Sequence, residues 1–336
     1  MSKALEIENL KVAFPTHRGV IRAVEGVSLY IDKGECLALV GESGCGKSVT
    51  SLAAMKLLGD TAIVRADKHI ICGEDVSGFS DKQMEALRGR RVSMIFQDAL
   101  SALDPVMTVG RQLDEVFIRH LRLSKKEARE RSVAALAEVG IPEPGARYRS
   151  FPHELSGGMR QRVLIAMAFA CEPELIIADE PTTALDVTIQ AQILELLKKM
   201  QQQSGTALLF ISHDLSVVSN MADRIAVMYS GKIAEQAQRD ELIARPLHPY
   251  TRGLLSAVIG INDKKDSFIH IKGTLPDPAD KPKGCYFCPR CSEAGEVCFV
   301  RQPLLKERGS GHYVRCHYLR CHYLRCHSSE RGEENE

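Results

Sequence analysis

The chain lacks three features, and each absence narrows the class of protein. No segment approaches the ~18 uninterrupted apolar residues of a membrane-spanning helix, and the run VLIAMAFAC has only the length of a core element. The first residues, MSKALEIENLKVAF, contain no apolar run of signal-peptide length. The 44 Lys and Arg residues nearly balance the 43 Asp and Glu residues, so bulk charge favours neither nucleic acid nor an anionic membrane surface.

Thiols are scarce along most of the chain, because only four of the eleven cysteines precede residue 285. Without an export signal, we expect the chain to stay in the cytosol, where thiols are kept reduced. The seven cysteines between Cys285 and Cys326 therefore favour metal ligands over disulfides.

The order of strand-like and helix-like segments predicts an α/β fold. The helix-patterned segment VTIQAQILELLKKMQQQ, closed by Gly205, separates two apolar strands, which is the order of a parallel βαβ unit. The predicted strands lie within residues 5–41 and at 92–97, 175–179 and 206–212. A helix is predicted at 47–58, and the sequence pattern over 99–152 is mainly helical. Within that texture, Ser124 is the expected N-cap of a helix, with Glu127 three residues later.

The segment GESGCGKS follows the apolar strand ECLALV and fits the phosphate-binding pattern G-x-x-x-x-G-K-[ST]. Its glycines let backbone N–H groups surround phosphate oxygens at the positive end of the following helix. Lys47 is expected to reach the β- and γ-phosphates and Ser48 to bind Mg²⁺. A chance glycine turn, the alternative, would produce this pattern in roughly one such chain in a hundred. The predicted nucleotide-binding residues are Gly41, Glu42, Ser43, Gly44, Cys45, Gly46, Lys47, Ser48 and Val49.

The segment LIIADE supplies the carboxylates that such a site requires. An apolar strand delivers Asp179 to its C-terminal end, where ligands bind in α/β sheets, so Asp179 is the expected Mg²⁺ partner. Glu180 follows directly and is placed to orient or deprotonate a water in line with the γ-phosphate. An acidic pair after a strand is often only a turn, but a phosphate-binding loop in the same chain favours the catalytic interpretation.

Shortly before this acidic strand the chain reads LSGGMRQR, and with this segment it resembles the ATP-binding cassette of an ABC transporter over about residues 5–258. The resemblance identifies Gln97 with the Q-loop glutamine, LSGG with the signature motif and His213 with the switch histidine. It identifies Ala184-Leu185-Asp186 with the D-loop, and Met159 stands where many members have Gln. It places Phe14 where the family stacks an aromatic ring on adenine; a core role is the alternative.

The resemblance implies a P-loop NTPase fold with a helical subdomain at about 99–160. It implies catalytic roles for Lys47, Gln97, Glu180 and His213, Mg²⁺ ligation by Ser48, Gln97 and Asp179, and ATP contacts by Ser156, Gly157, Gly158 and Asp186. In the family two cassettes dimerise head to tail, so that each signature loop closes over the other's ATP. One chain carries one cassette, so a second ATPase subunit, the same or different, is implied.

Several segments resemble the oligopeptide/dipeptide branch, which also includes nickel importers: SALDPVMTVGRQL, HDLSVVSNMADRIAVMYSGKIAE and RPLHPYTRGLL. Asp104 stands where Asn is commoner. This branch implies an ATPase that powers peptide uptake at the cytoplasmic face of the cell membrane. Its expected partners are integral-membrane permease subunits and, indirectly, an external substrate-binding protein, and not nucleic acid. The alternatives are a nickel or glutathione importer, a soluble ABC ATPase acting on ribosomes or DNA, and an iron–sulfur regulatory protein that uses ATP as a switch.

The same branch carries a cysteine segment, and its pattern matches Cys285, Cys291, Cys298 and Cys316. The resemblance implies a [4Fe–4S] cluster on these thiolates, and zinc is the chemical alternative. Cys288 could compete as a ligand, and the repeats RCHYLRCHYLRCH are interpreted as a small duplication that needs only Cys316. The predicted divisions are a cassette at 1–258, a linker at 259–284, a small metal-binding Cys-rich extension at 285–327 and a disordered tail at 328–336.

Overall fold

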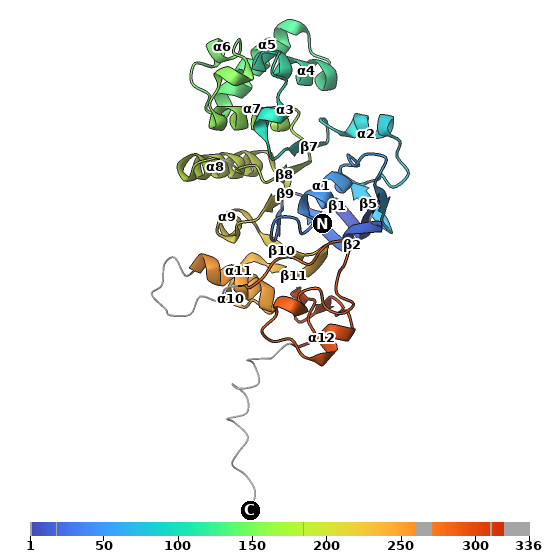
Figure 1. Cartoon of the computed structure of the whole chain (residues 1–336). Helices are drawn as coiled ribbons and strands as arrows, with labels where there is room; N and C mark the ends of the chain where they lie inside the picture. The colour runs from blue at the N-terminus through green and yellow to red at the C-terminus, as the bar shows by residue number, and fades with distance from the viewer. Residues whose placement is uncertain (1, 18, 184, 260–270, 310, 319–336) are drawn as a thin grey trace, which may run out of the picture.

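The computed structural model describes residues 2–17, 19–183, 185–259, 271–309 and 311–318 (Figure 1). Ala184 of the predicted D-loop, Cys321 and Cys326 of the repeats, and the predicted tail lie outside these residues. No helix in the described part of the chain is long and apolar enough to cross a membrane.

An eight-stranded sheet forms the centre of the molecule, in the order β12-β13-β11-β10-β3-β9-β8-β7. The five strands from β10 to β7 run parallel, and β11, β13 and β12 continue the sheet antiparallel. Segments such as CLALV and LIIAD are buried at every position, as expected for strands covered on both faces. The bounds are β3 Cys36–Val40, β7 Val92–Ile95, β8 Leu175–Asp179, β9 Ala207–Ser212, β10 Arg224–Tyr229, β11 Lys232–Gln238, β12 Lys306–Glu307 and β13 Tyr313–Val314.

A smaller antiparallel sheet lies beside α1, in the order β2-β1-β5-β6 with β4 paired to β1. Its bounds are β1 Lys3–Thr16, β2 Gly19–Asp32, β4 Ile63–Arg65, β5 Lys68–Ile71 and β6 Glu74–Asp75. One apolar cluster packs this sheet and α1 against one face of the main sheet. A second cluster packs the helices α7, α8 and α9 against the other face.

Helices α4, α5 and α6 form a lobe at the top of Figure 1, with α3 and α7 below them, while α12 lies at the bottom. The bounds of the helices are α1 Lys47–Ala54, α2 Asp81–Leu87, α3 Ala99–Ala102, α4 Val109–Leu121, α5 Lys125–Glu138, α6 Pro144–Arg147, α7 Gly157–Phe169, α8 Val187–Ser204, α9 Leu215–Met221, α10 Arg239–Ala244, α11 Pro249–Ile259 and α12 Glu296–Val300, with short 3₁₀ turns at Pro152–Glu154 and Cys288–Arg290. The helices from α3 to α6, with the start of α7, lie within the residues predicted as a helical subdomain.

The predicted elements are present, with shifts at their ends. The helix predicted over 47–58 stops at Ala54, since Lys56 adopts a left-handed backbone with φ 50° that α-helix cannot continue through. The predicted N-cap of α5 is correct: Ser124 Oγ accepts the N–H of Glu127, and the Glu127 carboxylate accepts the N–H of Ser124.

The C-terminal segment, which comprises the described residues from 271 to 318, packs on the cassette and contributes to the same apolar core. Its strands β12 and β13 extend the main sheet, with Val314 opposite Glu235 of β11. Phe287 is buried in the same apolar cluster as the main sheet. The Glu235 carboxylate, wholly buried, accepts hydrogen bonds from the N–H groups of Leu247 and His248 and lies 2.7 Å from His312 Nε2. Buried polar contacts and apolar packing thus both hold the C-terminal segment against the cassette.

Candidate functional site

The glycine-rich loop between β3 and α1 approaches other backbone so closely that side chains are excluded. A Cβ on Gly41 would lie 2.2 Å from Met228 O, and one on Gly46 would lie 2.7 Å from Ala23 O. Gly46 is also the N-cap of α1, with φ 110°, a backbone conformation that glycine adopts readily. The loop therefore leaves the first N–H groups of α1 unobstructed for an anion.

Lys47 is held at the floor of the site. Its Nζ donates to Gly41 O at 2.8 Å and to Glu42 O at 3.2 Å, and it lies 3.6 Å from Glu180 Oε1. Because this ammonium is buried beside a carboxylate, it presents a fixed positive charge where phosphate oxygens would enter.

Ser48 and Asp179 form the expected pair of oxygen ligands. Ser48 Oγ donates to Asp179 Oδ1 and Ser51 Oγ donates to Asp179 Oδ2, both at 3.1 Å. Burial raises the pKa of Asp179 above its usual range, although the two serine hydrogen bonds act in the opposite direction. A hydroxyl beside a buried carboxylate at the strand end is the oxygen donor set that Mg²⁺ prefers, so these residues fit that ion.

The Glu180 carboxylate contacts the other predicted catalytic residues, which are Lys47, Gln97 and His213. Its Oε2 accepts hydrogen bonds from Gln97 Nε2 at 3.2 Å and Thr183 Oγ1 at 3.0 Å, and lies 3.2 Å from His213 Nδ1. Glu180 has φ 45°, in the left-handed region that a residue with a side chain seldom occupies. Strain of this kind typically accompanies functional sites, and here it places the carboxylate between Lys47 and His213.

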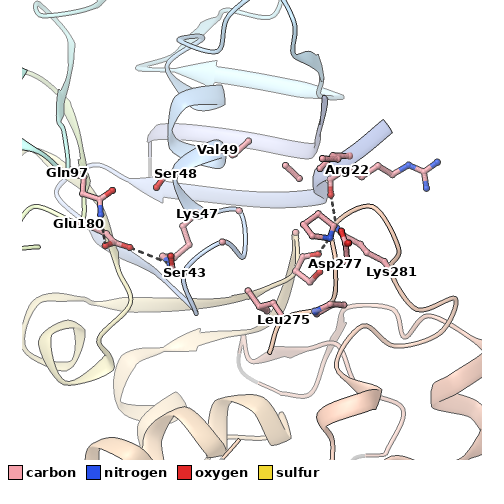
Figure 2. Close-up of a pocket in the computed structure, with 18 residues that line it drawn as sticks. Arg22, Ser43, Lys47, Ser48, Val49, Gln97, Glu180, Leu275, Asp277 and Lys281 are labelled. Carbon is pink, nitrogen blue, oxygen red and sulfur yellow. Dashed lines mark hydrogen bonds and ion pairs between the residues drawn. The ribbon is translucent and has the colours of Figure 1, made fainter. Parts of the chain in front are cut away.

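A cavity of about 430 Å³ connects these groups (Figure 2). The predicted residues that line it are Ser43, Gly44, Gly46, Lys47, Ser48, Val49, Gln97 and Glu180. Gly41, Glu42, Cys45, Asp179 and His213 lie around the cavity without lining it. Phe14 is also absent from the lining and packs, partly buried, against the core beside the small sheet; its adenine-stacking role stays a prediction.

The predicted signature and D-loop residues lie together but away from this cavity. Ser156 caps α7 by accepting the N–H of Met159, and Asp186 caps α8 by accepting the N–H of Ile189. A Cβ on Gly158 would lie 2.6 Å from Ile189 Cγ2, so glycine is required where the two helix starts meet. None of these residues lines the cavity that contains Lys47.

Several contacts were not anticipated from the sequence. Tyr250 OH accepts the N–H of Glu42, and Arg290 donates to the Glu42 carboxylate at 3.0 Å. Leu275, Asp277 and Lys281 of the predicted linker line the cavity itself. Tyr250 belongs to RPLHPYTRGLL, which the sequence marked only as a branch feature, and no local pattern signals the others.

The four predicted cluster cysteines, Cys285, Cys291, Cys298 and Cys316, lie in the C-terminal segment and are all unpaired thiols. Burial, followed by neighbouring thiols that include Cys298 and Cys316, raises the pKa of Cys285 and of Cys291 to about 11 each. Within the described residues, however, no three His, Cys, Asp or Glu side chains are grouped closely enough to hold a metal ion. The prediction of a metal-binding extension is therefore not confirmed.

The strand–loop–helix around Lys47 and the carboxylates at the end of the neighbouring strand define a P-loop nucleoside triphosphatase. The family model described as "ABC transporter" matches residues 24–183, and that described as "Oligopeptide/dipeptide transporter, C-terminal region" matches residues 234–298. The chain is 49% identical to the dipeptide transport ATP-binding protein DppD of Bacillus subtilis (strain 168), over 94% of this chain and 95% of that protein. It is also 49% identical to the oligopeptide transport ATP-binding protein AppD of the same organism, over 94% and 97%.

Among solved structures, the dimeric ATP-binding cassette MJ0796 bound to ADP and Pi is similar, with 27% identity and a TM-score of 0.62. The match covers 70% of this chain and 98% of that one. The chain belongs to the ABC transporter family of ATP-binding proteins, and ATP hydrolysis is its expected activity. The predicted cassette fold is confirmed.

Proposed function

We propose that this chain is the ATP-hydrolysing subunit of an ABC importer for di- or oligopeptides, peripheral at the cytoplasmic face of the membrane. The observation that carries the proposal is the convergence of Gln97, Glu180 and His213 beside the phosphate-binding loop. The peptide substrate is supported by the names of the relatives, which are dipeptide and oligopeptide transport proteins, and by the match to the transporter C-terminal region.

The proposed chemistry assigns each side chain one task. Lys47 and the N–H groups of the loop bind the β- and γ-phosphates, and Ser48 with Asp179 would hold Mg²⁺, with Gln97 as a further ligand. That ion supplies positive charge against the phosphate oxygens when it is bound. The Glu180 carboxylate orients and deprotonates the attacking water, and His213, which lies 3.2 Å from that carboxylate, holds the water and the γ-phosphate.

A second cassette is proposed to complete each site. Ser156, Gly157 and Gly158 start α7 with free backbone donors, yet they do not line the cavity of their own chain. Because such a helix start attracts anions, these residues are placed to close over ATP bound by a partner cassette. Asp186 caps the helix whose Ile189 packs against Gly158. It would therefore take part in the same contact.

The permease subunits are proposed to dock on the helical lobe next to Gln97. The stretch of chain on either side of Gln97 has exposed apolar side chains at Phe96, Leu100 and Val106, the last 79% exposed. Apolar side chains gathered on one surface mark interaction sites. Through Gln97, a helix seated on this surface would be connected to the hydrolytic carboxylate.

Co-purification from membranes tests the assembly. Tagged protein should recover integral permease subunits and a second ATPase or a second copy, whereas recovery of ribosomes would support the soluble alternative. Val106→Asp should reduce permease recovery severalfold, since it places a charge in the docking surface. Val300→Asp is the matched control, because Val300 on α12 is similarly exposed at 75% and far from that surface.

We propose further that the thiols of Cys285, Cys291, Cys298 and Cys316 hold a [4Fe–4S] cluster. The proposal is supported by the match of residues 234–298, which include three of these cysteines, to the transporter C-terminal region, and by the influence of Cys298 and Cys316 on the pKa of Cys285 and of Cys291. Anaerobically purified protein should contain about four irons per chain and absorb broadly in the visible. Colourless protein with one zinc per chain would overturn the assignment.

A further inference from the structure

The nucleotide cavity extends beyond the phosphate-binding residues to a second end, to which no role has yet been assigned. Lys47, Ser48 and Glu180 occupy one end, while Ile21–Ala23 of β2 and Leu275–Pro278 of the C-terminal segment line the other. Figure 2 shows Leu275 and Asp277 across the cavity from Val49. Because both ends belong to one cavity, a nucleotide with its phosphates on the loop places its ribose and base at this second end.

Leu275 and its proline neighbours provide an apolar wall. Leu275 packs, partly buried, against both apolar clusters of the cassette. Leu275 Cδ1 is 4.0 Å from where a Cβ on Gly44 would lie, so this side chain is a neighbour of the phosphate-binding loop. Pro276 and Pro278 limit the backbone freedom of the wall. A firm apolar surface of this kind suits the face of a nucleobase.

Lys281 fixes this wall to the cassette. Its Nζ donates to Arg22 O at 2.6 Å, Glu25 Oε1 at 2.8 Å and Ser230 O at 3.1 Å, and the side chain is 10% exposed. A lysine ammonium has three hydrogen-bond donors, and the protein uses all of them. Lys281 is therefore a positioning residue rather than a phosphate ligand.

Asp277 is the charged side chain that this wall presents. Its Oδ1 accepts the N–H of Ala279 at 2.8 Å, and no described residue donates a hydrogen bond to Oδ2. A carboxylate repels phosphate but accepts strong hydrogen bonds from hydroxyl groups. In dinucleotide-binding folds, carboxylates bind ribose by accepting hydrogen bonds from its hydroxyl groups in this way.

We infer that residues 275–278 form the nucleoside wall of the ATP site and that Asp277 accepts a hydrogen bond from a ribose hydroxyl, so that the chain selects ribonucleotides. This inference rests on the proposed ATPase function. It makes the C-terminal segment part of the nucleotide site.

Calorimetric titration with ADP and with 2′,3′-dideoxy-ADP tests this role, since neither compound is hydrolysed. A hydrogen bond to a charged group predicts that the wild-type protein binds ADP about tenfold more tightly than the dideoxy compound. Asp277→Ala should bring that ratio to about one by weakening ADP alone. Asp280→Ala is the matched control, because Asp280 is an exposed acid of the same segment that does not line the cavity, and it should keep the wild-type ratio.

The outcomes separate this inference from the function on which it rests. If Asp277→Ala weakens both compounds equally, or changes neither, Asp277 only shapes the loop and the inference is overturned. A wild-type ratio near one overturns it as well. If folded wild-type protein binds neither compound, while Lys47→Ala behaves identically, the ATPase function fails and this inference fails with it.

Discussion

The two ends of the nucleotide cavity are built in different ways. The phosphate end uses residues that belong to short contiguous motifs at the ends of parallel strands. Its side chains contact one another directly, since Ser48 donates to Asp179 and both Lys47 and Gln97 contact Glu180. The nucleoside end uses a segment that returns from the far end of the chain and is fastened by Lys281 and Arg290. The phosphate end is therefore encoded in short segments of sequence, whereas the wall around the nucleoside depends on tertiary contacts.

The largest effect should come from the phosphate end. Glu180→Gln keeps the side chain's shape but removes the base, so hydrolysis should fall by about 10²- to 10⁴-fold while ADP affinity stays within about twofold. Phosphate release and calorimetry measure the two quantities. Glu130→Gln on the exposed surface of α5 serves as control, and unchanged hydrolysis in Glu180→Gln would remove Glu180 from its role.

The next prediction concerns the free energy of unfolding in acid, which should depend on His248. Burial lowers the pKa of His248 to about 4, so between about pH 6.5 and pH 4 the unfolded chain binds a proton that the folded chain does not. The free energy of unfolding should therefore fall as the pH falls, by about 2 kcal/mol between pH 7.5 and pH 5. Chemical denaturation at both values measures this loss.

Two variants isolate that contribution. His248→Asn can still accept the N–H of Tyr250 and should lose less stability on acidification than the wild type, by the same ~2 kcal/mol. His153→Asn, at an exposed histidine, should retain the full loss. Equal pH dependence in all three proteins would show that His248 does not titrate as its burial requires.

A double-mutant cycle on Glu42 and Arg290 tests whether the two ends are coupled. The Arg290 side chain is 7% exposed and that of Glu42 28%, so Arg290→Met and Glu42→Gln should show a coupling of about 1–2 kcal/mol in the free energy of unfolding. Additive losses would mean that the ion pair does not join the C-terminal segment to the phosphate-binding loop.

The smallest effect is expected at Phe14. Because Phe14 does not line the cavity, Phe14→Leu should change ADP affinity by less than about twofold, whereas loss of a stacked ring would weaken it by about three- to tenfold. Calorimetry on this variant decides between the adenine-stacking role and the core role. A tenfold loss would move the base toward β1 and away from Leu275.

Most of the fold and the phosphate end could be predicted because their signals are local. The strand before Gly41, the strand before Asp179 and the capping box of α5 each lie within a few residues of sequence. The contact between Arg290 and Glu42, in contrast, joins residues 248 positions apart, and nothing in the composition of the predicted linker indicates that Asp277 lies in the nucleotide cavity. The proposed contact of the signature loop with the ATP of a partner cassette also requires a second chain.

The antiparallel strands β12 and β13 have a consequence for how the protein is made. They pair onto β11 from a part of the chain that comes well after it, so the edge of β11 is covered only after this later segment has been synthesised. Until then the nascent protein exposes an unpaired strand edge, which is a site for unwanted pairing with other chains. A premature stop before residue 306 would leave this exposure permanent.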